Sequence, residues 1–245
     1  MTINRPLGFP VPDPTPAPRP SRVILQGRTV TLEPLQASHA EELFPHVGGA
    51  AVGWLWDYML GGPVADVEEL RTQFGIWEKS EDPVIWAIRV PTKKSTSTQV
   101  VGYIGFLDIA HVHRTIEVGH VMYSLALQRT TAATETFYLL ARYAFRDLGY
   151  RRLSWKCNNL NESSKKAALR YGFLYEGLFR QHLIIKGRNR DTAWFSMLDS
   201  EWSGDGGFEA GYQRWLDERN FDEQGKQERR LEEFVVRKPV QKEKG

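Results

Sequence analysis

The segment from Thr115 to Phe173 has the pattern of a strand, a turn, a helix, a second strand and a second helix. Its first strand is expected over Ile116–Met122, and its first helix from roughly Thr131 to Leu148. About four backbone N–H groups at the start of a helix have no intrahelical partner, and the positive end of the helix dipole lies there. Such a turn can hold a pyrophosphate, so the chemistry is expected near the start of this helix.

The elements around this segment predict a mixed sheet. Apolar segments of strand character run first as a meander and then alternate with helices, which is typical of an α/β (α+β) fold with helices covering the sheet. The last two strands are expected to meet at a turn of Gly187, Arg188 and Asn189. Expected strands are Thr29–Leu32, Val84–Val90, Val100–Ile109, Thr115–Tyr123, Arg152–Cys157, Leu174–Lys186 and Thr192–Leu198; expected helices are Gln36–Val47, Asp66–Glu78 and Glu162–Tyr171.

The chain is expected to have one domain, residues 23–202, between two extensions. Residues 1–22 contain seven of the thirteen prolines and predict an extended arm, because proline does not continue a helix. The arm is either a disordered tail or a segment packed over the domain or a neighbouring subunit. Residues 203–245 predict a charged, helical extension that packs on the parent domain or on a separate partner. The candidate apolar anchors are Leu7, Phe9 and Val11 in the arm, and Phe208, Tyr212, Trp215 and Leu216 in the extension.

Composition excludes several classes of protein. The 245 residues are 41% hydrophobic and 25% charged, as in ordinary globular proteins. The formal net charge of +2 creates no field that favours nucleic acid. The apolar runs are far shorter than the roughly 18 residues of a membrane span, and the N-terminus does not resemble a secretory signal. The single cysteine fits a reducing compartment, so a cytoplasmic or nuclear protein without membrane contact is expected.

Several short motifs resemble those of one enzyme family. Gln128, Thr131 and Ala133 occupy the three marked positions of the loop Gln/Arg-x-x-Gly-x-Gly/Ala, although threonine replaces the middle glycine. Further matches are Glu117-Val118-Gly119, Asn161-x-x-Ser164, Arg170-Tyr171-Gly172-Phe173, Glu176-Gly177, Arg180 and Asp191. Through these motifs, residues 27–202 resemble the GNAT superfamily of acyl-CoA-dependent N-acetyltransferases. The closer resemblance is to the branch that includes the ribosomal-protein alanine N-acetyltransferases.

The resemblance implies a GNAT-like sheet, mixed but mostly antiparallel, with about seven strands, flanking helices and a V-shaped cofactor cleft. It implies acetyl-CoA as the cofactor and no metal. Pantetheine would run along the strand before the loop, and a backbone N–H near Val121 would stabilise the oxyanion. The expected cofactor contacts are Val121, Met122, Tyr123, Gln128, Arg129, Thr130, Thr131, Ala132, Ala133, Thr134, Asn158, Asn161 and Ser164.

Thr131 is a departure from the family loop. Glycine allows a positive φ and close approach of the backbone to a phosphate, whereas threonine allows neither freely. Binding survives if the loop keeps helical torsions; the alternatives are weaker CoA affinity, a shifted phosphate, or an ordinary capped helix. Asn161 and Ser164 are expected to cap the next helix, and capping can coexist with the cofactor contact that the resemblance implies.

Glu117 is the candidate base, because a carboxylate in an apolar strand needs a function or a charged partner. The resemblance implies that it assists removal of a proton from the amine, often through water. The structural alternative is a salt bridge to Arg142 or Arg146 of the following helix. His120 is the second candidate; it lies three residues on and faces the opposite side in a regular strand, unless a bulge intervenes.

No side chain is assigned to protonate the leaving thiolate. Many relatives have a tyrosine four residues before the glycine of the Gly-Phe pair, but this chain has Ala168 there. Tyr171 is adjacent to that glycine and is expected to point elsewhere, so the thiolate would leave unaided or through water. Cys157 is expected to be a core residue rather than a nucleophile.

The acceptor site is expected between two walls. The resemblance implies that the connection between the first two helices forms one wall, and in the aromatic-rich segment from Trp54 to Met59 this wall would be lined by Trp54, Trp56 and Tyr58, with Asp57 attracting a cationic amine. Arg180 and His182 would contribute to the opposite wall, where Lys186, Arg188 and Arg190 add positive charge that suits an acceptor with an anionic group. Alternatively, the aromatic residues only anchor the loop, and the basic residues around Arg188 belong to a turn exposed to solvent.

The leading hypothesis is an acetyl-CoA-dependent N-acetyltransferase that transfers acetyl directly, in a ternary complex, to a small-molecule amine or a peptide N-terminus. The alternative is a non-catalytic acyl-CoA-binding or interaction module, motivated by Thr131 and the absent tyrosine. Nucleic-acid binding ranks third, because the chain lacks an interleaved basic and aromatic face. A homodimer is one assembly that the sequence allows, but the residues do not determine it.

Overall fold

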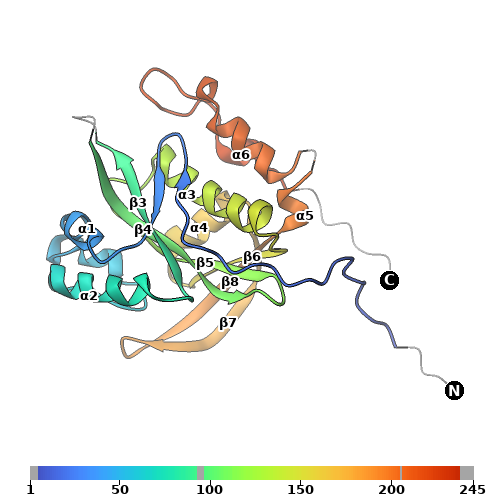
Figure 1. The fold of residues 1–245 in the computed structure, drawn as a ribbon, viewed down its shortest axis with the longest axis horizontal. Helices are drawn as coiled ribbons and strands as arrows, with labels where there is room; N and C mark the ends of the chain where they lie inside the picture. The colour runs from blue at the N-terminus through green and yellow to red at the C-terminus, as the bar shows by residue number, and fades with distance from the viewer. Residues whose placement is uncertain (1–4, 93–96, 205, 238–245) are drawn as a thin grey trace.

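The computed structural model describes residues 5–92, 97–204 and 206–237. Within this part of the chain, eight strands form one sheet in the order β1-β2-β3-β4-β5-β6-β8-β7 (Figure 1). All neighbouring strands are antiparallel except β5 and β6, which are parallel. The strands are β1 (Leu25–Gln26), β2 (Thr31–Pro34), β3 (Val84–Pro91), β4 (Thr98–Ala110), β5 (Thr115–Tyr123), β6 (Arg152–Asn158), β7 (Leu174–Ile185) and β8 (Arg188–Leu198). The expected mixed, mostly antiparallel sheet is confirmed, with one more strand than expected because β1 is too short to be recognised in the sequence.

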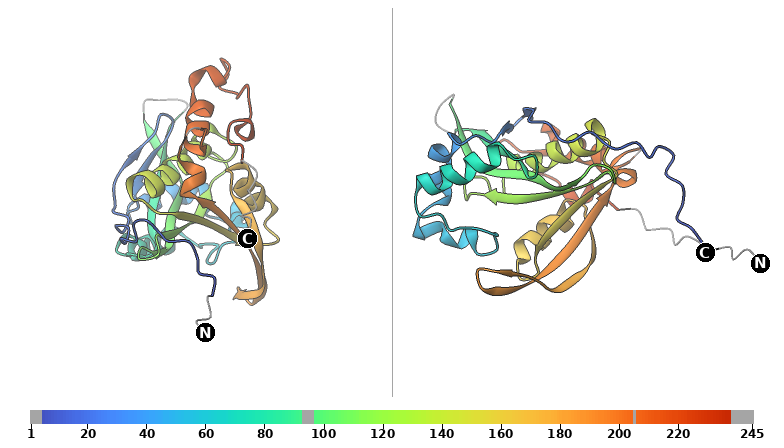
Figure 2. Two further views of the ribbon diagram at one scale, coloured as in Figure 1. Left: turned by 90° about the vertical axis from the view of Figure 1, so that its right-hand side faces the viewer. Right: turned by 60° about the horizontal axis from the view of Figure 1, so that its bottom comes forward.

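Helices cover the two faces of the sheet unequally (Figures 1 and 2). One face carries α1 (His39–Val47), the 3₁₀ segment η1 (Ala50–Trp56) and α2 (Val67–Glu78), over a core with Phe74 and Tyr103 at its centre. The opposite face carries α3 (Thr131–Arg142), α4 (Glu162–Arg170) and α6 (Phe208–Leu216), packed on a larger core around Phe137. The apolar stripes of these helices supply both cores, since one face of each helix is apolar.

Strand parity tells which side chains face which layer. In β6 and β8 the odd-numbered residues, such as Trp155 and Phe195, belong to the core under α3. Successive side chains of a strand alternate between the two faces, so the even-numbered residues of these strands face the side of α1 and α2. Over β6, β7 and β8 this side carries no helix, and Figure 2 shows the strands of the β7–β8 hairpin extending beyond the helices. The sheet therefore presents an open, partly polar surface beside α1 and α2.

Two differences from the expected element boundaries have a clear physical reason. The helix expected to reach Leu148 is α3 up to Arg142 and then one π-helical turn, Tyr143–Asp147, which the helical periodicity does not reveal. Strand β8 begins at Arg188, four residues early, because the hairpin turn consists of Lys186 and Gly187 rather than residues 187–189. Both have positive φ, 51° and 70°, as the right-handed twist of a two-residue hairpin requires.

The two extensions behave differently. Residues 5–16 run away from the body of the domain in Figure 1, and Leu7 and Phe9 are 91% and 72% exposed. Contact with the domain begins near Ala17, whose N–H donates to the carbonyl of His111 at 3.0 Å. The C-terminal extension lies against α3 through α6, and Tyr212 stacks on Tyr138 with ring centroids 5.7 Å apart. Residues 1–4 of the arm and residues 205 and 238–245 of the extension lie outside the described residues.

Replacing Tyr212 by Phe tests how firmly α6 is attached to the domain. The buried Tyr212 hydroxyl donates to the carbonyl of Tyr171 at 3.0 Å. Loss of this bond leaves a buried carbonyl unsatisfied, so we expect the free energy of unfolding to fall by about 1–2 kcal/mol. Urea denaturation measures the change, and Tyr175→Phe, on an exposed ring, is the control. An unchanged midpoint would mean that the extension opens independently of the domain.

Candidate active site

The parallel strands β5 and β6 separate part-way along their length. They pair only where Thr115–Val118 lies beside Arg152–Trp155, although β5 continues to Tyr123 and β6 to Asn158. The stretch 119–123 of β5 therefore pairs with β4 on one side and has a free edge on the other. Because N–H and C=O groups point alternately to both sides of a strand, part of this stretch directs its backbone polar groups into the gap. This is the edge on which an extended ligand could add as a strand, and it contains Val121, Met122 and Tyr123.

The loop after β5 ends at the N-terminus of α3. Thr130 is the N-cap residue, and its hydroxyl accepts a hydrogen bond from the N–H of Ala133 at 3.2 Å. Thr131 is the first helical residue, and the positive φ of the loop, 61°, falls on Arg129. The site of the missing glycine therefore keeps helical torsions. Within the described part of the chain, no acceptor is found for the N–H groups of Arg129, Thr131 and Ala132, which leaves them free for an anion.

Side chains hold this loop against β5. The amide of Gln128 donates to the carbonyl of Tyr123 at 2.8 Å, which ties the start of the loop to the end of the free edge. Ala132, Ala133 and Thr134 are buried, so their side chains do not reach a ligand and only their backbone is available. The Thr134 hydroxyl accepts from Arg170 at 2.9 Å and connects the first turn of α3 to α4.

The start of α4 borders the same gap. Asn161 is the N-cap residue and accepts from the N–H of Ser164 at 3.0 Å. Ser164 Oγ accepts from the indole of Trp155, and Asn158 Oδ1 accepts from the N–H of Leu160. The capping explanation of these residues is therefore correct, and a cofactor contact would use their remaining polar atoms or the adjacent backbone.

Glu117 is buried on β5 just before the strands part. Only 4% of its surface is exposed, and Oε2 lies 2.5 Å from Lys156 Nζ on β6, an ion pair without the angles of a hydrogen bond. Burial raises the pKa of the Glu117 carboxyl to about 7, against the opposing effect of the Lys156 charge. A carboxylate that titrates near neutrality can accept a proton and release it again. Gly119 keeps the space beside it open, since a Cβ there would lie 3.3 Å from Glu117 Oε1.

Lys156 is a site residue that the sequence analysis missed. It contacts Asp108 of β4 as well as Glu117, and its ammonium lies 4.4 Å from the ring centroid of Trp194 on β8. The alternative partners proposed for Glu117, Arg142 and Arg146, are wrong, because Glu117 faces away from α3. The alternation Leu153-Ser154-Trp155-Lys156-Cys157 was the available signal, since it places the lysine on the face opposite to the core.

A bulge in β5 brings His120 to the same face as Glu117. The register with β4 shifts between Gly119, opposite Gly105, and Met122, opposite Tyr103, and His120 has a φ of 48°. Its ring lies 4.8 Å from that of Trp77 on α2. Burial lowers the pKa of His120, so the imidazole is neutral near pH 7. An irregularity of this kind re-aims a side chain, and it makes His120 available to the open surface.

The two expected walls of an acceptor site lie close to each other. Lys186, at the tip of the β7–β8 hairpin, donates from Nζ to the carbonyl of Trp56 at 2.7 Å, so the hairpin touches the loop between α1 and α2. Trp56 is buried and its indole donates to the carbonyl of Val47, which makes it an anchor of this loop. Trp54, Asp57 and Tyr58 are exposed and remain candidates for contact with an acceptor.

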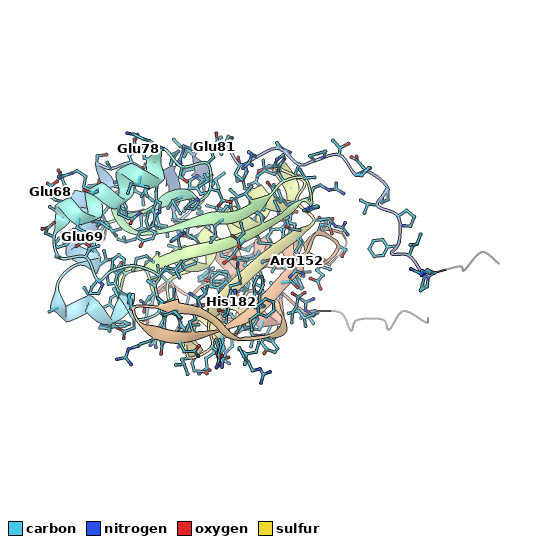
Figure 3. All side chains as sticks on the ribbon, turned by 90° about the horizontal axis from the view of Figure 1, so that it is seen from below. Glu68, Glu69, Glu78, Glu81, Arg152 and His182 are labelled. Atoms are coloured by element: carbon cyan, nitrogen blue, oxygen red, sulfur yellow. The ribbon has the colours of Figure 1, made fainter. Side chains whose placement is uncertain are left out.

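The hairpin contributes His182 on the open surface. Its Nδ1 lies 3.0 Å from Thr192 Oγ1, and its ring packs edge-on to Phe179 at 5.5 Å. Figure 3 shows His182 and Arg152 along the half of the sheet formed by β6, β8 and β7, seen from below. Arg180 lies in a bulge of β7 opposite Asp191, and its side chain is exposed.

No tyrosine on α4 approaches the gap as a general acid. Ala168 is fully buried in the core, and Tyr171 stacks on Phe137 with the ring centroids 4.4 Å apart. Its hydroxyl donates to the carbonyl of Ala133 at 3.4 Å, and burial raises its pKa. Burial also raises the pKa of Cys157, which lies in the core. Both residues are therefore structural.

Comparison with known proteins identifies the family of the chain. Residues 29–174 match the family model described as the acetyltransferase (GNAT) domain, which covers more than half of the chain. The chain belongs to the GNAT family of acetyltransferases.

Solved and curated relatives support the same conclusion. A GCN5-related N-acetyltransferase from Brucella melitensis is 41% identical, with a TM-score of 0.84 over 90% of this chain and 97% of that one. Two proteins of Bacillus subtilis (strain 168) are each 30% identical to this GNAT chain. YoaA, named "Uncharacterized N-acetyltransferase", matches over 45% of the chain, and YdaF, named "Putative ribosomal N-acetyltransferase", matches over 42%. These two matches span 62% and 56% of the relatives' own lengths.

Proposed function

We propose that this chain transfers an acetyl group from acetyl-CoA directly to a primary amine in a ternary complex. The acceptor is a small-molecule amine or a peptide N-terminus. The observation that carries the proposal is the position of the buried Glu117 beside a gap whose other end opens on the free N–H groups of α3. Family membership supports acetyl transfer in general, and the geometry of this gap is the reason for the more specific assignment.

The residues around the gap fit coenzyme A. The free amides of Arg129, Thr131 and Ala132 would hold its diphosphate, and the unpaired edge of β5 at 119–123 would hold the pantetheine amides. The cofactor supplies the activated thioester. Among solved structures, that of the self-immunity acetyltransferase MccE, described as a complex with acetyl-CoA and AMP, shares the fold with a TM-score of 0.58 at 23% identity.

Glu117 would act as the base. The amine proton passes to the Glu117 carboxylate, directly or through water, as the N–C bond forms and the C–S bond breaks, and the thiolate leaves unaided or takes a proton from water. A backbone N–H of residues 121–123 would stabilise the oxyanion. An α-amino group with a pKa of about 8 is partly deprotonated at neutral pH, so a base with a pKa of about 7 is sufficient for it. His120 is the second group on this face that could accept or relay a proton.

A thiol-release screen tests the proposal. Purified protein and acetyl-CoA are incubated with amino acids, polyamines, aminoglycosides and short peptides, and free CoA thiol is measured against a blank without amine. We expect amine-dependent release with at least one class. Binding of CoA by calorimetry without release for any amine would instead support a non-catalytic acyl-CoA-binding module.

Lys156→Met tests whether the ion pair sets the protonation of Glu117. Removal of a cation close to a carboxylate raises the carboxyl pKa by about 1–3 units. The acidic limb of the kcat/KM profile, expected near pH 7 for the wild type, should therefore move to higher pH, with activity regained in alkaline buffer. Lys156→Arg keeps the charge, so its acidic limb should lie within about half a pH unit of the wild-type limb. A uniformly lower profile with an unmoved limb would contradict this role.

A further inference from the structure

Arg190 is a half-buried cation without a counter-charge. It lies on β8, and its Nε donates to Thr192 Oγ1 at 3.2 Å. In residues 5–92, 97–204 and 206–237, no carboxylate lies within ion-pair distance of its guanidinium. Burial lowers the pKa of Arg190, while the charge of Glu117 opposes this effect. A half-buried guanidinium with no carboxylate beside it keeps donors that the described residues do not use, and these donors can bind an anionic group of a ligand.

The position of Arg190 connects it to the proposed catalytic face. Residues 190, 192 and 194 are alternate residues of β8 and face the open side of the sheet, opposite to the core residues Ala193 and Phe195. Trp194 pairs with Lys156 on β6, and Lys156 contacts Glu117. The hydrogen bond to Thr192 directs the Arg190 side chain along β8 toward Trp194, and thus toward Lys156 and Glu117. Thr192 lies about 7 Å from Trp194 along the strand, so Arg190 and Glu117 can contact two ends of one small molecule.

The neighbouring cations are accounted for in other ways. Arg180 and Arg188 are exposed to solvent, so water solvates their charge. Lys186 donates to the carbonyl of Trp56 at the hairpin tip. Lys156 is neutralised by Glu117 and Asp108. Of these five cations near the acceptor site, Arg190 is therefore the one that is neither exposed nor paired with a carboxylate or a backbone carbonyl in the described part of the chain.

We infer that the acceptor amine carries an oxyanion, a carboxylate or a phosphoryl group, which Arg190 binds several bonds away from the reacting nitrogen. This inference rests on the proposed acetyl transfer and names the class of its substrate. The planar guanidinium can donate two parallel hydrogen bonds to either oxyanion, which gives orientation as well as affinity. Polyamines and amines with a neutral tail lack the group that compensates Arg190.

Matched acceptors test the inference. A series of ω-amino acids of increasing chain length is compared with the corresponding ω-amino amides, and a second arm uses aminoalkyl phosphates of the same lengths. We expect kcat/KM for the acids, the phosphates or both to exceed that for the amides about 10- to 100-fold at the best length, as for hydrogen bonds to a charged group. The arm with the higher value identifies the oxyanion. Arg190→Gln should remove this preference, because kcat/KM for the charged acceptors falls to about the level of the amides.

Arg188→Gln is the matched control, because it removes an exposed charge from the same hairpin and should keep the preference. If Arg190→Gln does not fold, the inference is tested on the wild type with carboxylic acids that lack the amine; these should compete with the acceptor and not with acetyl-CoA. Equal kcat/KM for the charged and neutral amines overturns the inference while leaving acetyl transfer intact. A higher KM for acetyl-CoA in Arg190→Gln, with the acceptor preference retained, also overturns it and assigns Arg190 to the cofactor. Absence of thiol release with every amine contradicts the proposed function itself.

Discussion

Glu117→Gln is expected to lower kcat by about 10²- to 10⁴-fold without weakening CoA binding. The amide is isosteric with the carboxylate but cannot accept the amine proton. Lys156 keeps its contact with Asp108 in this variant, so no buried lysine is left unpaired. Free CoA thiol, measured at fixed times under saturating substrates, gives kcat, and calorimetric titration with CoA shows whether the cofactor site is intact. Glu176→Gln makes the same change on an exposed carboxylate of β7 and is the control. Its kcat should stay within about twofold of the wild-type value.

Stability provides a second readout for Glu117. Its carboxyl pKa is about 7 in the folded chain and 4.5 in the reference state, so the folded state binds the proton more tightly. The contribution of this group to stability is therefore largest below pH 4.5 and is lost as the pH rises through about 7. We expect the melting temperature of Glu117→Gln, relative to wild type, to rise from pH 5 to pH 8.

A near-wild-type kcat in a folded Glu117→Gln variant would exclude Glu117 as the base.

Thr131→Asp is expected to weaken CoA binding about 100-fold. The carboxylate would stand at the first helical position, beside the free N–H groups of Thr131 and Ala132, where the diphosphate is expected. Two unit charges 4 Å apart interact by about 4 kcal/mol at an effective dielectric constant of 20, and salt reduces this repulsion only partly. Aspartate in the first turn favours the helix, so the variant should remain folded. Calorimetry gives the Kd, and circular dichroism monitors the fold.

Thr131→Asn separates charge from shape, because asparagine has the size of aspartate without its charge. We expect its Kd for CoA to stay within about threefold of wild type. Thr131→Gly restores the glycine of the family loop, and it should bind CoA no more weakly than wild type, since the loop already has helical torsions at this position. If Thr131→Asp and Thr131→Asn bind CoA equally well, the diphosphate does not lie at the start of α3.

Local patterns were sufficient for much of the fold. Apolar alternation located the long strands β3, β4 and β5, and Asp66 was recognised at the start of α2, where its side chain accepts from the N–H of Glu69. Elements that depend on tertiary contacts were harder to predict from the sequence. Strand β1 has only two residues and is defined by its pairing with β2. The π-helical turn after α3 depends on packing. The sequence left open whether the cofactor loop keeps helical torsions at Thr131; the structure has them there and places the positive φ of the loop at Arg129.

The sequence by itself determined the order of strands and helices, the GNAT motifs, and the presence of a carboxylate at residue 117 in an otherwise apolar strand. These properties depend on residues close together in the chain, where periodicity and capping operate. Only the tertiary structure decided that Lys156 is the partner of Glu117, that a bulge turns His120 to the same face, and that Arg190 lies half-buried without a counter-charge. Strand register and parity across β5, β6 and β8 set these relations, and register is a property of paired strands rather than of any one segment.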